Sequence, residues 1–287
     1  MEIEFVDFKM TTPLIKITDK IYAKLETYQP TGSVKDRMVN YIVDDAVRKG
    51  KIIPGVTEII EATSGNTGIA LSAAAAKLGC KCYIIMPNNM SVERRKMMKS
   101  FGAEIIFVEA NQFQEAITIR NELLERENSW SPYQFENPLN VECHFKTTAP
   151  EICGQLADLE LTWSAFVHGS GTGGTMMGMI EYVDYWDIGI DCVLTSPFES
   201  AADHGIQGIN DGADFLLDKN MIDYEVKVKT EDAIKRMREF AKETGLLVGI
   251  SSGANLIAAE EYVERYNPEG VVVTMLCDRG ERYLSNF

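Results

Sequence analysis

Short apolar runs alternate with longer amphipathic or alanine-rich stretches along most of the chain. A short apolar run is typical of a buried strand, and apolar residues three or four positions apart indicate one face of a helix. In the first half of the chain, these patterns predict helices over 36–50, 67–78, 91–102 and 112–127, and strands over 57–63, 82–86 and 104–108.

The second half continues the alternation with one interruption. The segment 198–226 carries only weak signals and is expected to form loops. Thr230 is expected to cap a helix whose apolar residues fall on one face. The remaining patterns predict helices over 147–159, 172–182 and 254–266, and strands over 164–168, 191–196, 246–250 and 271–276.

Near-continuous apolar strands joined by helical crossovers are typical of parallel sheets that carry helices on both faces. The chain contains no low-complexity linker and no sequence repeat. We therefore predict an α/β protein with two open parallel-sheet domains. The smaller domain is expected to span 30–137, and the larger domain to combine 1–29 with 138–287.

The composition limits the number of domains, the kinds of partner and the cellular compartments that suit this protein. The 287 residues are 45% hydrophobic and 25% charged, which suits one or two globular domains. The formal net charge of −15 argues against nucleic acid or an anionic membrane as a partner. The first residues lack a signal-peptide pattern, and the longest largely apolar stretch, 69–78, is too short to span a bilayer. Six cysteines without a CxxC pair favour a reducing cytoplasm, and three scattered histidines predict no metal site.

Three turns rich in glycine, serine and threonine follow predicted strands, where open parallel sheets bind their ligands. The first, GSGTGGT at 169–175, opens a helix, and its glycines and unpaired N–H groups suit a phosphate. It also fits the dinucleotide-binding pattern G-x-G-x-x-G, with Glu199 placed to bind a ribose. A Walker A loop is excluded, because Thr175 stands where lysine is required.

The other two turns each allow a chemical and a structural interpretation. GISSG at 249–253 fits the nucleophile elbow of hydrolases, but all three histidines precede Ser251, and that fold needs one after it. Ser251 is then either a hydroxyl that faces a cleft or a helix cap. SGNTG at 64–68 places small donors at a helix start, where they either hold a carboxylate or phenolic oxygen or cap the helix.

Lys35 stands at the start of the first predicted helix, in the segment PTGSVKDR. A lysine there is ordinarily a solvated surface charge. The N-terminal end of a helix disfavours a cation, however, and this favours a lysine that must lose its proton to act as a nucleophile.

Together, these segments resemble the cysteine synthases, also called O-acetylserine sulfhydrylases. This family depends on pyridoxal phosphate and is related to cystathionine β-synthase. The resemblance covers about 12–285 and implies the tryptophan synthase β-like fold (fold type II), with the cofactor in the cleft between the two domains. The motifs that carry it, in chain order, are TTPLIKI, KLETYQPTGSVKDR, EATSGNTGIALS, FGAEIIFVE, QFENPLN, KTTAPEI, GSGTGGT, GISSGAN and CDRGERYLS.

The resemblance also assigns roles to individual residues. Lys35 matches the lysine that holds the cofactor as a Schiff base, Asn66 matches the partner of its 3′ oxygen, and Ser251 matches the partner of its ring nitrogen. The phosphate loop corresponds to Gly171, Thr172, Gly173, Gly174 and Thr175. The substrate is expected to contact Thr63, Ser64, Gly65, Thr67, Gln134 and Gly208.

The implied reaction is a β-replacement that makes L-cysteine from O-acetyl-L-serine and sulfide. It would run from a Lys35 internal aldimine through an aminoacrylate, with Lys35 moving the α-proton. A neutral Ser251 beside the ring nitrogen favours direct β-elimination over long-lived ring carbanions. O-phosphoserine sulfhydrylase and cystathionine β-synthase activities remain alternatives, although the HGIQGIN segment has no arginine for a substrate phosphate.

The resemblance further implies a cytoplasmic homodimer that can bind the C-terminal tail of serine acetyltransferase. Two interpretations from other classes remain open. One is a dinucleotide-binding oxidoreductase, which would rest on GSGTGG alone. The other is a non-catalytic relative that binds a partner, although such proteins usually lose the lysine or the phosphate loop, and this chain has both.

Overall fold

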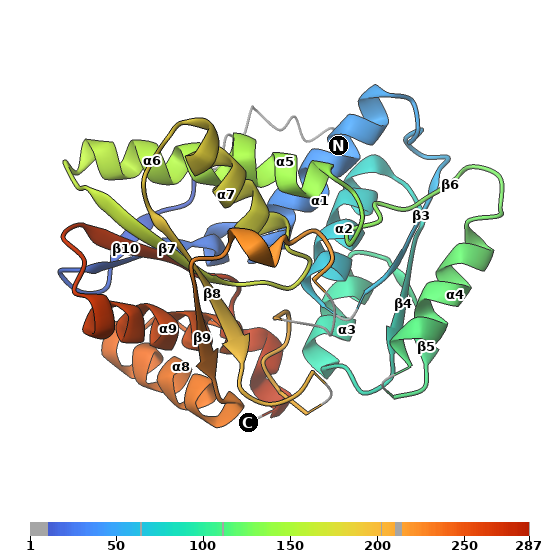
Figure 1. Cartoon of the computed structure of the whole chain (residues 1–287). Coiled ribbons are helices and arrows are strands. Elements are labelled where there is room, and N and C mark those ends of the chain that lie inside the picture. The colour runs from blue at the N-terminus through green and yellow to red at the C-terminus, as the bar shows by residue number, and fades with distance from the viewer. Residues whose placement is uncertain (1–10, 64, 111, 202, 210–213, 287) are drawn as a thin grey trace.

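The computed structural model folds the chain into two α/β lobes that lie side by side (Figure 1). Each lobe is built on its own sheet, with helices on both faces. This confirms the predicted fold class. The structure describes residues 11–63, 65–110, 112–201, 203–209 and 214–286.

The larger lobe contains a six-stranded sheet in which all neighbouring strands are parallel except the first two. The strand order is β1 (Leu14–Lys16), β2 (Ile21–Leu25), β10 (Val271–Leu276), β7 (Trp163–Gly169), β8 (Asp191–Pro197) and β9 (Tyr224–Val228). One face packs against α8 (Thr230–Thr244) and α9 (Ile250–Tyr266). The other face lies under α5 (Leu139–Lys146), α6 (Thr148–Asp158) and α7 (Gly174–Tyr185) (Figure 1).

The smaller lobe contains a fully parallel four-stranded sheet. Its strand order is β5 (Glu104–Val108), β4 (Cys82–Pro87), β3 (Glu58–Ala62) and β6 (Ser129–Trp130). One face packs against α1 (Lys35–Arg48), α2 (Asn66–Leu78) and α3 (Val92–Ser100), and the other against α4 (Phe113–Leu123). The described elements also include the short 3-10 helices η1 (Glu26–Tyr28), η2 (Lys219–Met221) and η3 (Gly280–Asn286).

The strand predicted over 246–250 is wrong. Gly245 ends α8 in the left-handed conformation, with φ of +74°, and α9 already begins at Ile250. The connection is too short for a strand, and Val248 makes only an isolated bridge to Arg279. Val248 and Ile250 are nevertheless buried in the core of the larger lobe, so their apolar character reflects burial in a connection.

Two further expectations for this lobe need correction. The segment predicted as loops ends in β9, which pairs with β8 at the sheet edge and alternates exposed and buried residues. Thr230 does not cap α8, because it is the first helical residue and its hydroxyl accepts a hydrogen bond from the Gly205 N–H instead. The division of the chain at residues 30 and 137 stays a prediction. No helix among the described residues is long and apolar enough to cross a membrane.

A buried ion network joins the two lobes. Arg37 belongs to α1 of the smaller lobe, but its guanidinium lies 2.7 Å from Glu26 and 2.7 Å from Glu151, both in the larger lobe. Lys24 of β2 lies 2.9 Å from the same Glu151 carboxylate. Burial opposes ionisation of Glu26, yet the Arg37 guanidinium holds the pKa of that carboxyl below its usual range. The network therefore fixes α1 to the sheet of the larger lobe.

We expect Arg37→Met to lower the free energy of unfolding by about 3–5 kcal/mol, because it leaves the buried Glu26 carboxylate without its ion-pair partner. Denaturant unfolding followed by circular dichroism measures the loss. The control is Lys16→Met, which removes an ion pair to Asp19 on the exposed surface and should leave the unfolding midpoint in place. Equal losses in the two variants would contradict a special role for the network.

Candidate active site

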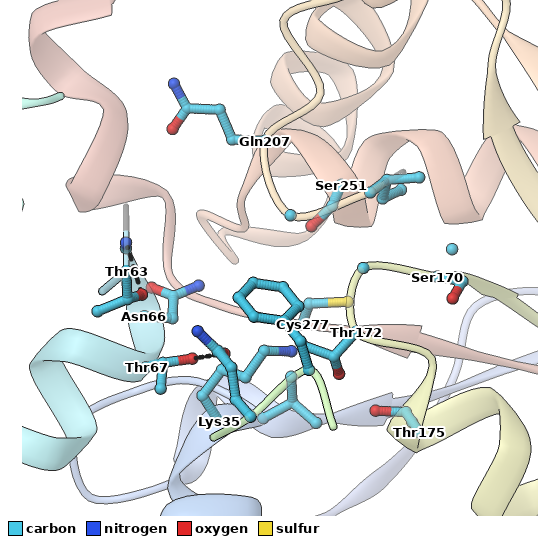
Figure 2. Close-up of a pocket in the computed structure, with 18 of the residues that line it drawn as sticks. Lys35, Thr63, Asn66, Thr67, Ser170, Thr172, Thr175, Gln207, Ser251 and Cys277 are labelled. Carbon is cyan, nitrogen blue, oxygen red and sulfur yellow. Dashed lines mark hydrogen bonds between the residues drawn. The ribbon is translucent and has the colours of Figure 1, made fainter. Parts of the chain in front are cut away.

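A cavity of about 570 Å³ lies between the two lobes. Residues that follow β3 line one side of it, and residues that follow β7 and β10 line the other, so it occupies the carboxyl ends of strands from both sheets. Its volume falls in the range of small-molecule sites, roughly 300–1,000 Å³. Figure 2 shows Lys35, Asn66 and Thr67 on one side, with Ser170, Thr172, Thr175 and Ser251 on the other.

Most residues predicted from the sequence line this cavity. The lining includes Lys35, Thr63, Gly65, Asn66, Thr67, Gln134, Gly171, Thr172, Gly173, Thr175, Gly208 and Ser251. Gly174, the first residue of α7, is not part of the lining. Ser64 lies outside the described residues. The roles that the resemblance assigns to these residues remain predictions.

Two helix starts form the smaller-lobe wall. Lys35 is the first residue of α1 and Asn66 the first residue of α2, so both stand where a helix presents unpaired N–H groups. Neither helix end carries a side-chain cap hydrogen bond. In Figure 2 the Lys35 side chain extends into the pocket near Asn66 and Thr67. A lysine in this position faces the cavity and not open solvent.

Asn66 is held by an aspartate that sequence reasoning missed. Its Nδ2 donates to Asp278 Oδ2 at 2.7 Å, and the Tyr283 hydroxyl donates to the same oxygen at 2.6 Å. The Asn66 Oδ1 atom is buried and has no hydrogen-bond partner among the residues that the structure describes. A buried amide oxygen left in this way is costly, which suits a site that presents it to a ligand.

The glycine turn after β7 is shaped by close contacts. Gly173 has φ of +88°, which favours glycine, and α7 begins at the next residue. A Cβ on Gly171 would lie 2.4 Å from the carbonyl oxygen of Gly208, and a Cβ on Gly174 would lie 2.0 Å from Asn140 Oδ1. The turn therefore brings bare backbone to the start of a helix, which is the arrangement that binds phosphate.

Polar side chains behind the turn fix its hydroxyls. Asn140 Nδ2 donates to Thr172 Oγ1 at 2.9 Å, and Thr175 Oγ1 lies 3.1 Å from the Nε2 atom of His144. Burial and the charge of Arg37 lower the pKa of His144 well below its ordinary value, so this ring is neutral. The hydroxyl of each threonine is thus held by a buried polar side chain behind the turn.

Two buried titratable residues of the lining, His168 and Cys277, are neutral. Burial, followed by the charge of Lys35, lowers the pKa of His168 to about 3. Burial raises the pKa of the Cys277 thiol to about 12. At neutral pH neither side chain is charged. No group of three or more metal-ligating residues occurs in the part of the chain that the structure describes.

Several lining residues were not predicted. His168 is the second-last residue of β7, and Cys277 directly follows β10. Arg94 reaches the cavity from α3, where it hydrogen-bonds Gln207 and lies over the Tyr283 ring. The strand-end position of His168 and the motif CDRGERYLS, which contains Cys277, were available signals. Nothing local marks Arg94, because its contact with Gln207 joins residues 113 positions apart.

The arrangement fits pyridoxal phosphate. The helix start at the glycine turn suits the phosphate, Lys35 suits the aldehyde, and the unpartnered Asn66 oxygen lies on the Lys35 side of the pocket. Ser251 lines the cavity within the first turn of α9 and presents its oxygen to it (Figure 2).

Comparison with known proteins agrees with this fit. The sequence model of a family described as pyridoxal-phosphate dependent enzyme matches residues 8–278. The probable cysteine synthase of Bacillus subtilis is 39% identical over 291 residues, which cover 96% of this chain and 93% of that protein. The cysteine synthase of Entamoeba histolytica superimposes with a TM-score of 0.88 at 35% identity, covering 99% of this chain and 91% of that one. The O-acetylserine dependent cystathionine β-synthase of Helicobacter pylori gives 0.85 at 35% identity, covering 98% of both chains.

We expect Gly171→Ala to weaken binding of pyridoxal phosphate at least tenfold, because the new methyl group would clash with the Gly208 carbonyl and displace the turn. Titration of the apoprotein, followed by cofactor absorbance, measures the affinity. Gly154→Ala is the control, since its Cβ on α6 would meet nothing within 4 Å. Unchanged affinity in Gly171→Ala would show that the phosphate does not depend on this turn.

Proposed function

The chain belongs to the family of pyridoxal-phosphate-dependent enzymes, and we propose that it makes L-cysteine from O-acetyl-L-serine and sulfide by β-replacement. One observation carries this proposal. A single cavity contains Lys35, a loop with the donors expected to bind a carboxylate and, across from them, the glycine turn expected to bind a phosphate. The cysteine synthase relatives, at 39% identity over nearly the whole chain, support the same reaction.

The cofactor would be held at four points. The backbone N–H groups and hydroxyls of 171–175 would bind its phosphate, Asn66 its phenolic oxygen, Ser251 its ring nitrogen and Lys35 its aldehyde. When bound, pyridoxal phosphate withdraws electrons from the α-carbon of an amino acid, which allows a β-substituent to leave.

The chain's own residues would then orient the substrate and move its proton. The start of α2, with Thr63, Ser64, Gly65 and Thr67, would bind the substrate carboxylate, together with Gln134. Lys35 is the amine positioned on that side of the pocket, and it would remove and return the proton at the α-carbon. Gly208 would face the bound substrate from the larger lobe, so both lobes would contribute to the closed site.

Ser251 would influence which reaction is favoured at the bound cofactor. It is 6% exposed and belongs to the first turn of α9. A hydroxyl cannot balance a positive ring nitrogen as a carboxylate does, so the ring is a weaker electron sink. This favours prompt loss of a β-substituent over reactions that need a long-lived carbanion, such as transamination.

One observation supports O-phospho-L-serine as a second candidate substrate. The HGIQGIN segment has no arginine, but Arg94 lines the same cavity from α3 and contacts Gln207 of that segment. A guanidinium there would suit a phosphate leaving group. The cystathionine β-synthase of Helicobacter pylori has a similar fold, which supports homocysteine as an alternative nucleophile.

The resemblance also underlies our proposal for partners and location. We infer a cytoplasmic homodimer. The side chains of Tyr185 and Trp186 are exposed, and their ring centres lie 5.1 Å apart in an edge-to-face contact, so they provide an apolar patch for such an interface. A serine acetyltransferase tail would present its terminal carboxylate to the same loop as the substrate does.

We expect Lys35→Ala to lower turnover of O-acetyl-L-serine and sulfide at least 10²–10⁴-fold, because it removes the positioned base as well as the cofactor's anchor. Borohydride treatment of the unmodified yellow protein should leave a reduced cofactor on the Lys35 peptide, detected by mass spectrometry. Lys16→Ala, on the exposed surface, is the control. Near-normal turnover in Lys35→Ala would disprove the assignment.

Kinetic measurements with different leaving groups and nucleophiles test which substrates the protein uses. We expect kcat/KM with sulfide to be at least tenfold higher for O-acetyl-L-serine than for O-phospho-L-serine, since the single guanidinium of Arg94 is already paired with Gln207. The reverse order would identify the phosphate ester as the substrate. Faster reaction with homocysteine than with sulfide would indicate cystathionine synthesis.

A further inference from the structure

A fully buried carboxylate lies one layer behind the cavity. Glu61 of β3 is 0% exposed and is not among the cavity-lining residues. Its Oε1 atom accepts the Ala62 N–H at 2.8 Å and lies 3.3 Å from the guanidinium of Arg120, a residue of α4 that is 6% exposed. The cost of burying two charges often exceeds their attraction, so stability alone is a weak reason for this pair.

Both members of the pair contact the segment that carries Gln134. The Gln134 N–H donates to Glu61 Oε2 at 3.5 Å, and the Arg120 guanidinium lies 4.7 Å from the centre of the Tyr133 ring. Tyr133 has φ of +51°, a left-handed conformation that a bulky residue rarely adopts. An unfavourable backbone is therefore held in place from two sides.

The same backbone directs the Gln134 side chain into the cavity. Gln134 is 3% exposed and lines the cavity, and its Oε1 atom accepts the Thr67 hydroxyl at 2.6 Å, a bond dashed in Figure 2. Its carbonyl accepts a hydrogen bond from Asn140 at 2.9 Å. The Gln134 amide oxygen already accepts the Thr67 hydroxyl. The NH₂ group of the same amide points away from Thr67 and can donate to an anion.

We propose that the buried Glu61–Arg120 ion pair positions Gln134 to bind the carboxylate of the amino acid substrate. The proposal rests on the function given above and adds two positioning residues to it, neither of which touches the substrate. Glu61 fixes the Gln134 backbone through its N–H, and Arg120 holds both Glu61 and the neighbouring Tyr133 ring. Loss of the pair should therefore weaken carboxylate binding while leaving the cofactor site intact.

Glu61→Gln is the direct test, since it preserves the shape of the side chain and removes its charge. We expect the cofactor-loaded variant to bind L-serine roughly tenfold more weakly than the unmodified protein, the loss expected for a misplaced hydrogen bond to a charged group. Ethanolamine, which lacks the carboxylate, should bind both proteins equally. Cofactor absorbance on titration reports both affinities. Equal weakening for the two amines would overturn the proposal.

A double-mutant cycle separates positioning from general damage. Gln134→Ala should weaken L-serine binding by a similar factor, and adding Glu61→Gln to that variant should cause no further loss. Losses that add would show that Glu61 does not act through Gln134. Glu58→Gln is the matched control, because Glu58 lies on the same strand and is also 3.3 Å from an arginine, Arg126, but at the exposed surface. It should bind L-serine as the unmodified protein does.

Arg120→Lys is a second test of the proposal, to be used if the Glu61→Gln variant does not fold. Lysine keeps a positive charge beside Glu61, so no buried carboxylate is left unpaired, but the planar group over Tyr133 is lost. The same selective loss of L-serine affinity is expected, and normal affinity in this folded variant would reject the proposal. An unmodified protein that binds no cofactor, or binds both amines alike, would instead refute the function proposed above.

Discussion

The contact between Arg37 and the carboxylates of Glu26 and Glu151 determines how the two lobes meet. Arg37 lies two residues after Lys35 on α1, so the network that fixes the helix also fixes the lysine. The glycine turn proposed to bind the phosphate belongs to the other lobe. A shift of α1 against the larger sheet would move the amine relative to the turn, and misplacement by about 1 Å is enough to impair chemistry of this kind about 10²-fold.

The polar groups of the cavity, like α1, are held in place by buried polar residues behind them. Asp278 holds Asn66 at 2.7 Å, Asn140 holds Thr172 at 2.9 Å, and Asn255 lies 3.3 Å from His168. Such support locks side chains before a ligand arrives, which lowers the entropy lost on binding. The two lobes thus form a site that is largely preorganised.

Local patterns in the sequence predicted the fold class, and most of the site residues assigned through the family resemblance line the cavity. Apolar runs such as 82–86 and 104–108 form strands of the smaller sheet, and strand-end glycine turns mark ligand sites in parallel sheets. The pattern failed at 246–250, where burial in a connection produces the same apolar run as a strand. The supporting residues could not be predicted, since Asn66 and Asp278 are 212 positions apart and meet only in the folded chain.

The placement of charge explains how an acidic protein can bind anionic ligands. The chain carries a net charge of −15, yet none of the described residues that line the cavity is an aspartate or glutamate. Lys35 and Arg94 are the charged side chains of that lining. Two carboxylates stand one layer back: Asp278 accepts a hydrogen bond from the Asn66 side chain, and Glu61 accepts one from the Gln134 backbone N–H. Burial raises the pKa of Glu61 to about 7 against the effect of Arg120, so its ionised form depends on that partner. Carboxylates in this second layer hold the residues that face the cavity, and they repel a phosphate or a substrate carboxylate less than a carboxylate in the lining would.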